Sequence, residues 1–203
     1  MATRLHRRDV LALVAATVAG IPALGHARAV RPCLDDLLGR RRMVRRFTDA
    51  PVPAAQVRRL LRAANRAPSA GNTRPWAFVV ARAARRRRAL ARAALGQDFV
   101  AAAPVVIVAC ADARRSRARY AVRGDLYAVI DTAFAAMLLL LAAVEERLGA
   151  CFVGALDEDA VRRVLRLPAA VRPLAVIPIG HPAESPPAQE LRALDAVIHD
   201  ETW

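Results

Sequence analysis

The sequence predicts an α+β domain in which helices cover a central mixed β-sheet. Apolar residues recur at helical spacing in some segments and form short continuous runs in others, and the two kinds of segment intermingle along the chain. The length of 203 residues suits one domain with its own core and an appended segment. The hydrophobic fraction of 56% excludes a disordered chain.

The first helix is expected over residues 54–66, directly after the Pro51-Val52-Pro53 turn, because Val57, Leu60 and Ala64 recur at helical spacing. The later segments give further helices and strands. In chain order we expect a strand over 77–80, a helix over 85–95, a buried strand over 105–110, a long helix over 126–148, a short strand near 151–153, a helix over 157–165 and a last strand over 174–179.

The apolar run Thr132–Val144 is about 13 residues long, too short for a membrane span. It begins after Asp131, which we expect to cap or pair within this helical region, and it predicts a helix buried on nearly all sides. A small domain rarely buries a helix all round by itself. Dimerisation is the simplest source of the missing cover.

Residues 1–29 have the pattern of an export signal. Arg4, Arg7 and Arg8 form a positive start, a broken apolar stretch follows over 10–24, and Ala27-Arg28-Ala29 fits a cleavage site. The arginine pair lies in a segment, His6 to Leu11, that resembles the twin-arginine signal motif. An ordinary secretory signal or an uncleaved anchor are the alternatives.

This interpretation divides the chain into the signal, a short linker over 30–35 and one domain over 36–203. It predicts export to the periplasm by the twin-arginine route, or a cytoplasmic protein if the signal does not function. Contact with the membrane is expected only through the signal, if it is uncleaved.

The net charge of +14 comes entirely from arginine, since the 32 positive residues include no lysine. Such a bias reflects composition as much as function, and no basic run carries interleaved aromatic residues for stacking on bases. We therefore expect no nucleic-acid partner, and we interpret the densest run, Arg85 to Arg88, as a solvated helix face. Three scattered cysteines exclude a disulfide framework or a zinc site, and Cys110 and Cys151 are expected to be buried.

Two segments carry the strongest functional signal. The first runs from Arg40 to Phe47 with the sequence RRRMVRRF, and the second from Ala67 to Val80 with the sequence APSAGNTRPWAFVV. Guanidinium groups match phosphate oxygens bidentately, and an asparagine side chain offers both a donor and an acceptor. The first segment therefore suits an anion such as phosphate, and the second can hydrogen-bond a polar ligand.

Together these segments resemble the arginine-rich opening and the A-P-S-x-x-N-x-Q-P-W segment of the nitroreductase family. Residues 148–154, 177–182 and 194–203 add further matches in the family's order, so the resemblance spans residues 36–203. It implies a nitroreductase-like fold, an intertwined homodimer and FMN as the cofactor, with NADH or NADPH as co-substrate.

The resemblance also implies the site. Ligands of the FMN phosphate and ribityl chain correspond to Arg41, Arg42 and Arg45. Residues that contact the flavin across the dimer interface correspond to Pro68, Ser69 and Asn72. The place where backbone amides face the flavin ring corresponds to Val153 and Gly154.

Three departures from the family pattern affect the site. Met43 stands where many members have serine, and Arg74 replaces a frequent glutamine. The usual basic phosphate ligand near the end of the chain aligns with Leu191, so the neighbouring Arg192 is our candidate for that role. No side-chain acid or base is transferable, because the chemistry belongs to the flavin. We expect His181 and His199 to be structural.

The predicted function is reduction of nitro, quinone or similar electron-poor small molecules by NAD(P)H in a ping-pong mechanism. One alternative is a non-catalytic flavin-binding or redox-partner module, and a mouth over residues 111–127 shaped for NADPH would distinguish the enzyme from it. Another is an exported arginine-rich protein that binds nucleic acid or anionic surfaces, which would carry no flavin.

Overall fold

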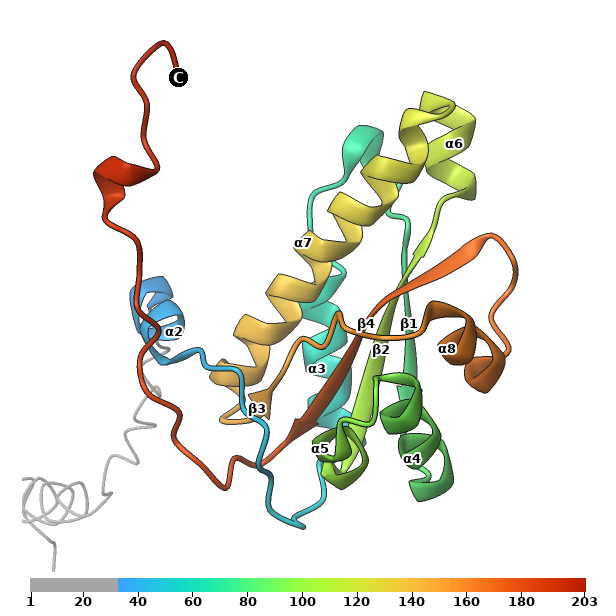
Figure 1. The fold of residues 1–203 in the computed structure, drawn as a ribbon, viewed down its shortest axis with the longest axis vertical. Coiled ribbons are helices and arrows are strands. Elements are labelled where there is room, and N and C mark those ends of the chain that lie inside the picture. The colour runs from blue at the N-terminus through green and yellow to red at the C-terminus, as the bar shows by residue number, and fades with distance from the viewer. Residues whose placement is uncertain (1–32) are drawn as a thin grey trace, which may run out of the picture. The chain divides into compact units, whose positions relative to one another are not determined.

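The computed structural model describes residues 33–203 (Figure 1). The predicted export signal and most of the linker lie outside this range. A four-stranded sheet forms the centre of the domain, in the order β1-β2-β4-β3. Its strands are β1 (Trp76–Ala81), β2 (Val105–Asp112), β3 (Gly149–Ala150) and β4 (Val171–Gly180).

All neighbouring strands of this sheet pair antiparallel. The prediction of a mixed sheet is therefore wrong for these four strands. Among the described residues, parallel pairing is confined to a single bridge between Met43 and Ala150. The short strand also begins earlier than predicted, at Gly149, and Val153 makes an isolated bridge to Val176 instead. Periodicity marks a strand but carries no information on the direction of its partner.

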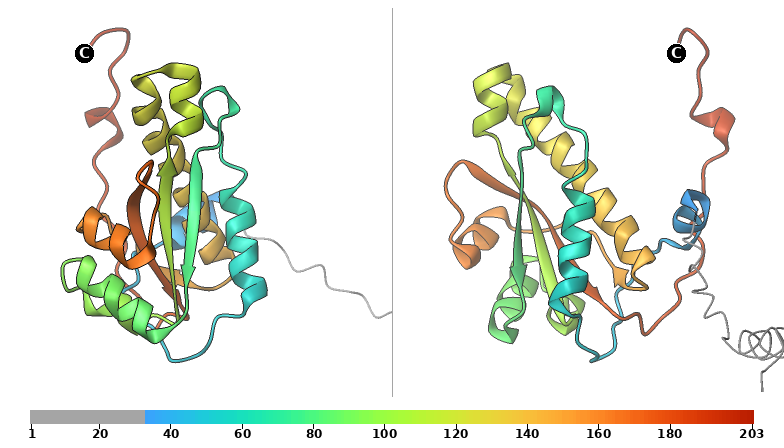
Figure 2. Two further views of the ribbon diagram at one scale, coloured as in Figure 1. Left: turned by 90° about the vertical axis from the view of Figure 1, so that its right-hand side faces the viewer. Right: turned by 180° about the vertical axis from the view of Figure 1, so that it is seen from behind.

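Helices cover both faces of the sheet (Figures 1 and 2). The side chains of β2 alternate between the faces, as the two-residue period of a strand requires. Val105, Ile107 and Ala109 join one buried cluster, and Val106, Val108 and Cys110 join the other. One face carries α3 (Ala54–Ala64) and α7 (Arg123–Glu145); the other carries α4 (Ala84–Ala93), α5 (Asp98–Ala102) and α8 (Glu158–Leu165).

Shorter elements connect or extend this framework. Asp157 caps α8, its side chain accepting the amide of Ala160 at 2.9 Å. Cys110 and Cys151 are buried as predicted, and burial raises the pKa of the Cys110 thiol to about 12, which makes it inert at neutral pH. The remaining elements are α2 (Leu34–Arg40), the 3-10 turn η1 (Ala70–Asn72), α6 (Arg114–Tyr120) and the 3-10 turn η2 (Leu194–Ala196).

The long helix α7 has 23 residues and starts three residues earlier than predicted. By length and composition it could cross a membrane, with a mean hydropathy of 2.1, but half of its most apolar stretch is buried inside the domain. It packs against α3 and the sheet, which is the position of a core helix. Within one chain it is not covered all round, because Ile130, Phe134 and Met137 remain exposed.

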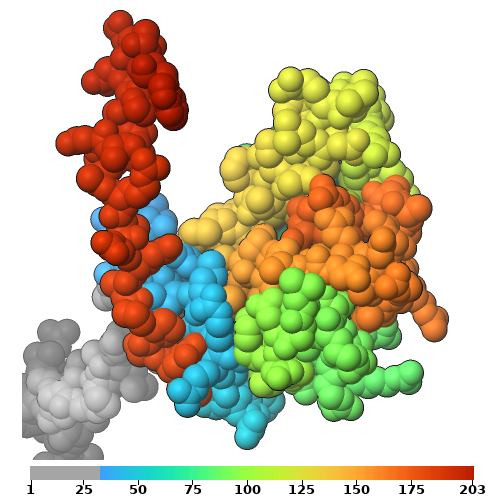
Figure 3. Space-filling model, viewed as in Figure 1, coloured from blue at the N-terminus to red at the C-terminus, as the bar shows by residue number. Residues whose placement is uncertain are grey.

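The C-terminal segment leaves the domain after β4 (Figure 3). Residues 187–203 are exposed throughout, and Trp203 is fully accessible. The ring of His199 stacks on that of Trp203 with 4.4 Å between centroids. This segment therefore has apolar side chains with no cover from its own domain.

Candidate functional site

The arginine segment lies along the edge of the sheet that β3 forms. The amide of Val44 donates to the carbonyl of Ala150 at 3.0 Å, and the amide of Thr48 donates to the carbonyl of His181 at 2.9 Å. These bonds hold the segment in an extended conformation after α2 ends, and the side chains of Arg41 and Arg42 lie near the C-terminal end of α7.

A cavity of about 270 Å³ opens between this segment and α7. Arg41 and Arg42 line it, together with Arg147, Leu140 and Glu184 among others. Arg42 Nη1 donates to the carbonyls of Gly39 and of Arg41, at 2.7 and 2.8 Å. Arg41 Nη1 is buried without a hydrogen-bond partner, an arrangement that costs free energy unless an acceptor is supplied.

Arg45, the third predicted phosphate ligand, does not line this cavity. Its guanidinium lies 5.9 Å from the centroid of the Phe99 ring. The carboxylate of Glu184 accepts the amides of Arg45 and Arg46, at 2.5 and 3.0 Å, and so fixes the backbone of the arginine segment. Glu184 is a site residue that no pattern in the sequence singled out.

Met43 departs from the family pattern, and the structure assigns it a packing role. Its sulfur accepts the amide of Phe152 at 3.4 Å, and its side chain lies against both buried clusters. The amide of Val153 donates to the carbonyl of Val176 at 3.0 Å, so it is engaged within the fold. Gly154, the other predicted amide donor of this pair, is exposed.

The second segment forms a tight turn between α3 and β1. The hydroxyl of Ser69 accepts the amide of Arg74 at 3.0 Å, and Asn72 Oδ1 accepts Arg74 Nε at 2.9 Å. Gly71 has a φ of 52°, and a side chain there would overlap Arg119 and Tyr120 of α6. The left-handed conformation of the turn therefore favours glycine, whereas the overlapped atoms are the ends of flexible side chains that can move aside.

Three polar contacts anchor this turn to the domain. Trp76 Nε1 donates to Asn65 Oδ1 at 3.0 Å, which ties the start of β1 to the end of α3. The hydroxyls of Thr73 and Ser116 share a buried hydrogen bond of 3.1 Å. The third contact comes from Asp131.

The prediction that Asp131 caps or pairs within its own helical region is wrong. It lies in α7 with only 3% of its surface exposed, and both of its carboxylate oxygens accept the amide of Ala70, at 3.2 and 3.1 Å. Burial raises the pKa of this carboxyl group, and the hydrogen bond opposes that shift. A lone acidic residue at the start of an apolar helical run was the available signal for this role.

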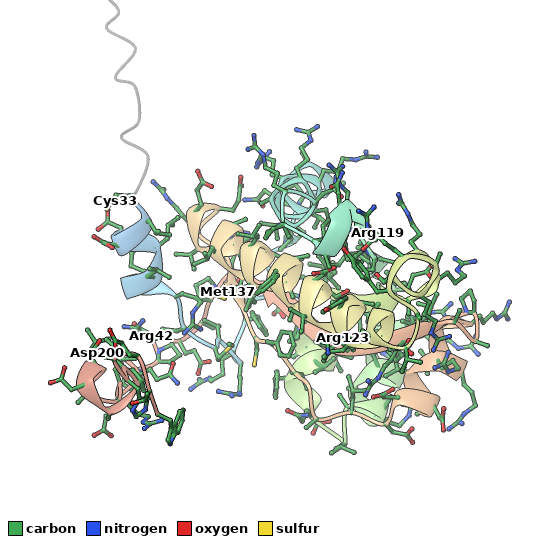
Figure 4. The ribbon with its side chains drawn as sticks, turned by 90° about the horizontal axis from the view of Figure 1, so that it is seen from above. Cys33, Arg42, Arg119, Arg123, Met137 and Asp200 are labelled. Atoms are coloured by element: carbon green, nitrogen blue, oxygen red, sulfur yellow. The ribbon has the colours of Figure 1, made fainter. Side chains whose placement is uncertain are left out.

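Within one chain the two segments lie at different levels of α7. Asp131 holds the Ser69–Asn72 turn, whereas the arginine cavity is lined by Leu140 and Val144. At a rise of about 1.5 Å per residue, the two levels are roughly 14–20 Å apart along the helix. Figure 4 shows the same separation, with Arg42 near one end of α7 and Arg119 and Arg123 at the other.

Arg192 lies in the exposed C-terminal segment and does not line the arginine cavity. Its Nη2 donates to the carbonyl of Ala196 at 2.8 Å. Its predicted part in phosphate binding remains a prediction.

The region over residues 111–127 comprises the end of β2, α6 and the first turn of α7. Two of its arginines are ion-paired with neighbouring acids, Arg114 with Asp112 at 2.5 Å and Arg117 with Asp125 at 2.7 Å. Arg119 is placed against the Gly71 turn. The region therefore borders the second segment, although its shape does not by itself separate an enzyme from a binding module.

Comparison with known proteins distinguishes an enzyme from a non-catalytic binding module. Residues 38–97 and 86–181 match the sequence profile of the Nitroreductase family. The chain belongs to the nitroreductase family. Over 173 residues it is 36% identical to the NADH dehydrogenase of Thermus thermophilus, covering 71% of this chain and 84% of that protein.

Two further relatives agree with this assignment. The FMN reductase (NAD(P)H) of Bacillus subtilis is 28% identical over 176 residues, covering 80% of this chain and 71% of the relative. The crystal structure of a nitroreductase family protein from Streptococcus pneumoniae superposes with a TM-score of 0.75 at 26% identity, covering 81% of this chain and 98% of that one. The α+β nitroreductase-like fold is thus confirmed, and the chain is an enzyme of the NAD(P)H nitroreductase and FMN reductase family.

Replacing Asp131 with asparagine tests the cost of its buried charge. Because the pKa is raised in the folded state, the carboxyl group favours folding most below its ordinary pKa, and this contribution falls as pH rises through the raised value. The asparagine side chain would stay neutral and can still accept the Ala70 amide. We measure the free energy of unfolding by urea denaturation. We expect the value for Asp131→Asn minus the value for the parent enzyme to increase between acidic and neutral pH. A difference that does not change with pH would contradict this role for burial.

Proposed function

We propose that this nitroreductase-family enzyme binds FMN and passes electrons from NADH or NADPH to nitro, quinone or similar electron-poor small molecules, in a ping-pong mechanism. The observation that supports FMN most directly is the buried, unpartnered Nη1 of Arg41 at the arginine cavity. A phosphate oxygen would satisfy this donor, and Arg42 and Arg147 would share the remaining charge.

The cavity fits one end of FMN and not the whole molecule. Its volume of about 270 Å³ lies just below the common range for small-molecule sites, roughly 300–1,000 Å³. Its lining of arginines beside Leu140 and Val144 suits the phosphate end of the cofactor. The isoalloxazine ring would then need contacts from outside this cavity.

A second copy of the chain is the proposed source of those contacts. Ile130, Phe134 and Met137 form an exposed apolar stripe on α7, and Phe134 is 48% exposed. Such a stripe on a helix that also separates the two site segments favours an interface between copies. In the proposed homodimer, the arginine segment of one protomer and the Ser69–Asn72 turn of its partner form one flavin site.

The turn retains hydrogen-bonding capacity for this purpose. Asn72 uses its oxygen for Arg74, which leaves its NH2 group free to donate, and the Ser69 hydroxyl accepts from Arg74 and keeps its own proton to donate. Bound FMN would supply the hydride-accepting and electron-donating chemistry. The chain's own residues bind and orient it, and Arg192 of the exposed C-terminal segment is the proposed third phosphate ligand.

The central test detects the bound cofactor and the oligomeric state in one measurement. We expect a purified yellow protein whose flavin absorbance elutes with a dimer in size-exclusion chromatography with light scattering, and whose colour is bleached by NADH or NADPH without air. A colourless protein that cannot be reconstituted with FMN would refute the cofactor. An FMN-loaded monomer at micromolar concentration would refute the shared site and leave the cofactor intact.

Replacing Arg41 and Arg45 together by alanine should remove FMN from a folded protein. Each charge-assisted contact contributes about 1.5–3 kcal/mol, so loss of the Arg41 contact alone weakens binding by at least about tenfold, and loss of both by at least about a hundredfold if Arg45 turns to the phosphate when FMN binds. Fluorescence titration with FMN measures the effect, and the two single variants separate the buried Arg41 from Arg45, which lies outside the cavity. Unchanged affinity in the double variant would show that the phosphate lies elsewhere.

We further propose that the enzyme is exported to the periplasm after FMN has bound. The sequence supports this through Arg7, Arg8 and the Ala27-Arg28-Ala29 pattern, and FMN is made in the cytoplasm, so a folded, loaded protein suits the twin-arginine route. Changing both arginines to lysine should leave a yellow, uncleaved precursor in the cytoplasm, seen by fractionation and mass spectrometry. Normal export of this variant would indicate an ordinary signal.

A further inference from the structure

A second basic cavity lies on the other face of the sheet, between α4 and α8. The two helices lie side by side in both views (Figures 1 and 2) and pack in the same buried cluster. The cavity has a volume of about 440 Å³, within the range of small-molecule sites. Beside Ala83, Ala89 and Val164, its lining consists of five arginines, Arg85, Arg86, Arg92, Arg163 and Arg166.

We call these five residues and their cavity the α4/α8 arginine pocket. The part of the chain that the structure describes supplies no carboxylate to its lining. The nearby acidic residues of α8 are engaged elsewhere. Glu158 pairs with Arg172 at 2.7 Å, Asp157 caps the helix, and Asp159 lies 4.0 Å from Arg162. Among the described residues, the ion pairs of the domain leave all five pocket arginines without an acidic partner.

The α4 side of the pocket opposes a local electrostatic preference, whereas Arg163 stands in the last turn of α8, where the helix dipole favours positive charge. The first turn of α4 contains no acidic residue and carries Arg85 and Arg86 instead, where the helix dipole disfavours positive charge. Arg166 closes α8 in a left-handed conformation, with a φ of 55°, at a position that favours glycine. Sequences tend to break such rules where function requires it.

The walls of the pocket are held in place. The guanidinium of Arg86 donates to the carbonyl of Val164, which ties α4 to the C-terminal end of α8. Leu90 of α4 and Val161 of α8 are fully buried beneath the cavity in the same cluster. The backbones that carry the five exposed arginines are therefore held beside one another, and Arg86 is also held by its own hydrogen bond.

We propose that the α4/α8 arginine pocket binds a compact oligophosphate anion, of the inorganic or nucleoside di- or triphosphate class. Guanidinium groups bind phosphate oxygens bidentately and keep their charge at every physiological pH. A cavity of this size holds a few phosphate groups, and several arginines around it require a ligand with more than one negative charge. The α4/α8 arginine pocket shares no lining residue with the arginine cavity proposed for the FMN phosphate, so the two are separate sites.

The test compares two variants of equal net charge. The pocket variant, Arg92→Gln/Arg163→Gln, removes two exposed pocket arginines for which the described structure shows no hydrogen bond. The control variant, Arg58→Gln/Arg88→Gln, removes two exposed arginines outside the pocket, and Arg88 also lies on α4. Binding of sodium triphosphate is measured by isothermal titration calorimetry on the full-length enzyme, in excess FMN and at constant ionic strength. Thermal melts verify folding, and Arg92→Gln alone replaces the double variant if the latter does not fold.

We expect one triphosphate per chain, an affinity loss of about tenfold or more in the pocket variant, and a change of less than about twofold in the control. ATP in place of triphosphate distinguishes the source: equal affinity indicates a free oligophosphate, and tighter binding indicates a nucleotide. The absence of triphosphate binding at millimolar concentration would overturn the proposal. An equal loss of triphosphate affinity in both variants would also overturn the proposal, because diffuse surface charge would then explain the binding. The same conclusion would follow if a single-stranded oligonucleotide bound more tightly than triphosphate and both variants weakened its binding equally.

Discussion

The packing of α7 against α3 and the inner faces of β2 and β4 is the interaction on which the rest of the structure depends. Ala135, Ala136, Leu139 and Ala143 are buried along this contact. Burial of a leucine such as Leu139 contributes about 1.5–3 kcal/mol, and the small alanines allow the helix to approach the sheet closely. Because α7 is fixed in this way, everything attached to it is fixed as well.

Both halves of the candidate site are attached to α7 at different levels. The buried carboxylate of Asp131 holds the Ser69–Asn72 turn, and the C-terminal end of the helix forms one wall of the arginine cavity. Each half includes a polar group that is costly to bury: Asp131 has no cationic partner among the described residues, and Arg41 Nη1 has no acceptor. Such groups are retained where positioning or ligand binding offsets their cost.

The arginines of this chain fall into groups with different physical roles. Some neutralise nearby acids, as Arg59 does with Glu146 and Arg172 does with Glu158. Others satisfy backbone carbonyls, as Arg162 does for Pro168 and Val171. A third group, at the arginine cavity and in the α4/α8 arginine pocket, has no acidic partner among the described residues. Many other arginines also lack an acidic partner in the described part of the chain, so what distinguishes these groups is that each lines a single cavity.

The sequence by itself determined the elements and the family. Apolar spacing located α3, α4, α7, α8 and the buried strands, because helical and strand periods differ and the cores they face are strongly apolar. The two motif segments were sufficient to identify the nitroreductase family, because their residue types and order are specific. The alternation of Val105 to Cys110 between two buried clusters also follows from a strand covered on both faces.

Tertiary structure alone decided which groups meet. The antiparallel order of the strands, the hold of Asp131 on a turn 61 residues away and the support of the arginine segment by Glu184 all join residues distant in sequence. Periodicity reports only which side of an element is apolar, so it could not distinguish a solvated arginine face on α4 from one wall of a cavity. That distinction depends on α8, which packs beside α4 through contacts that no local pattern contains.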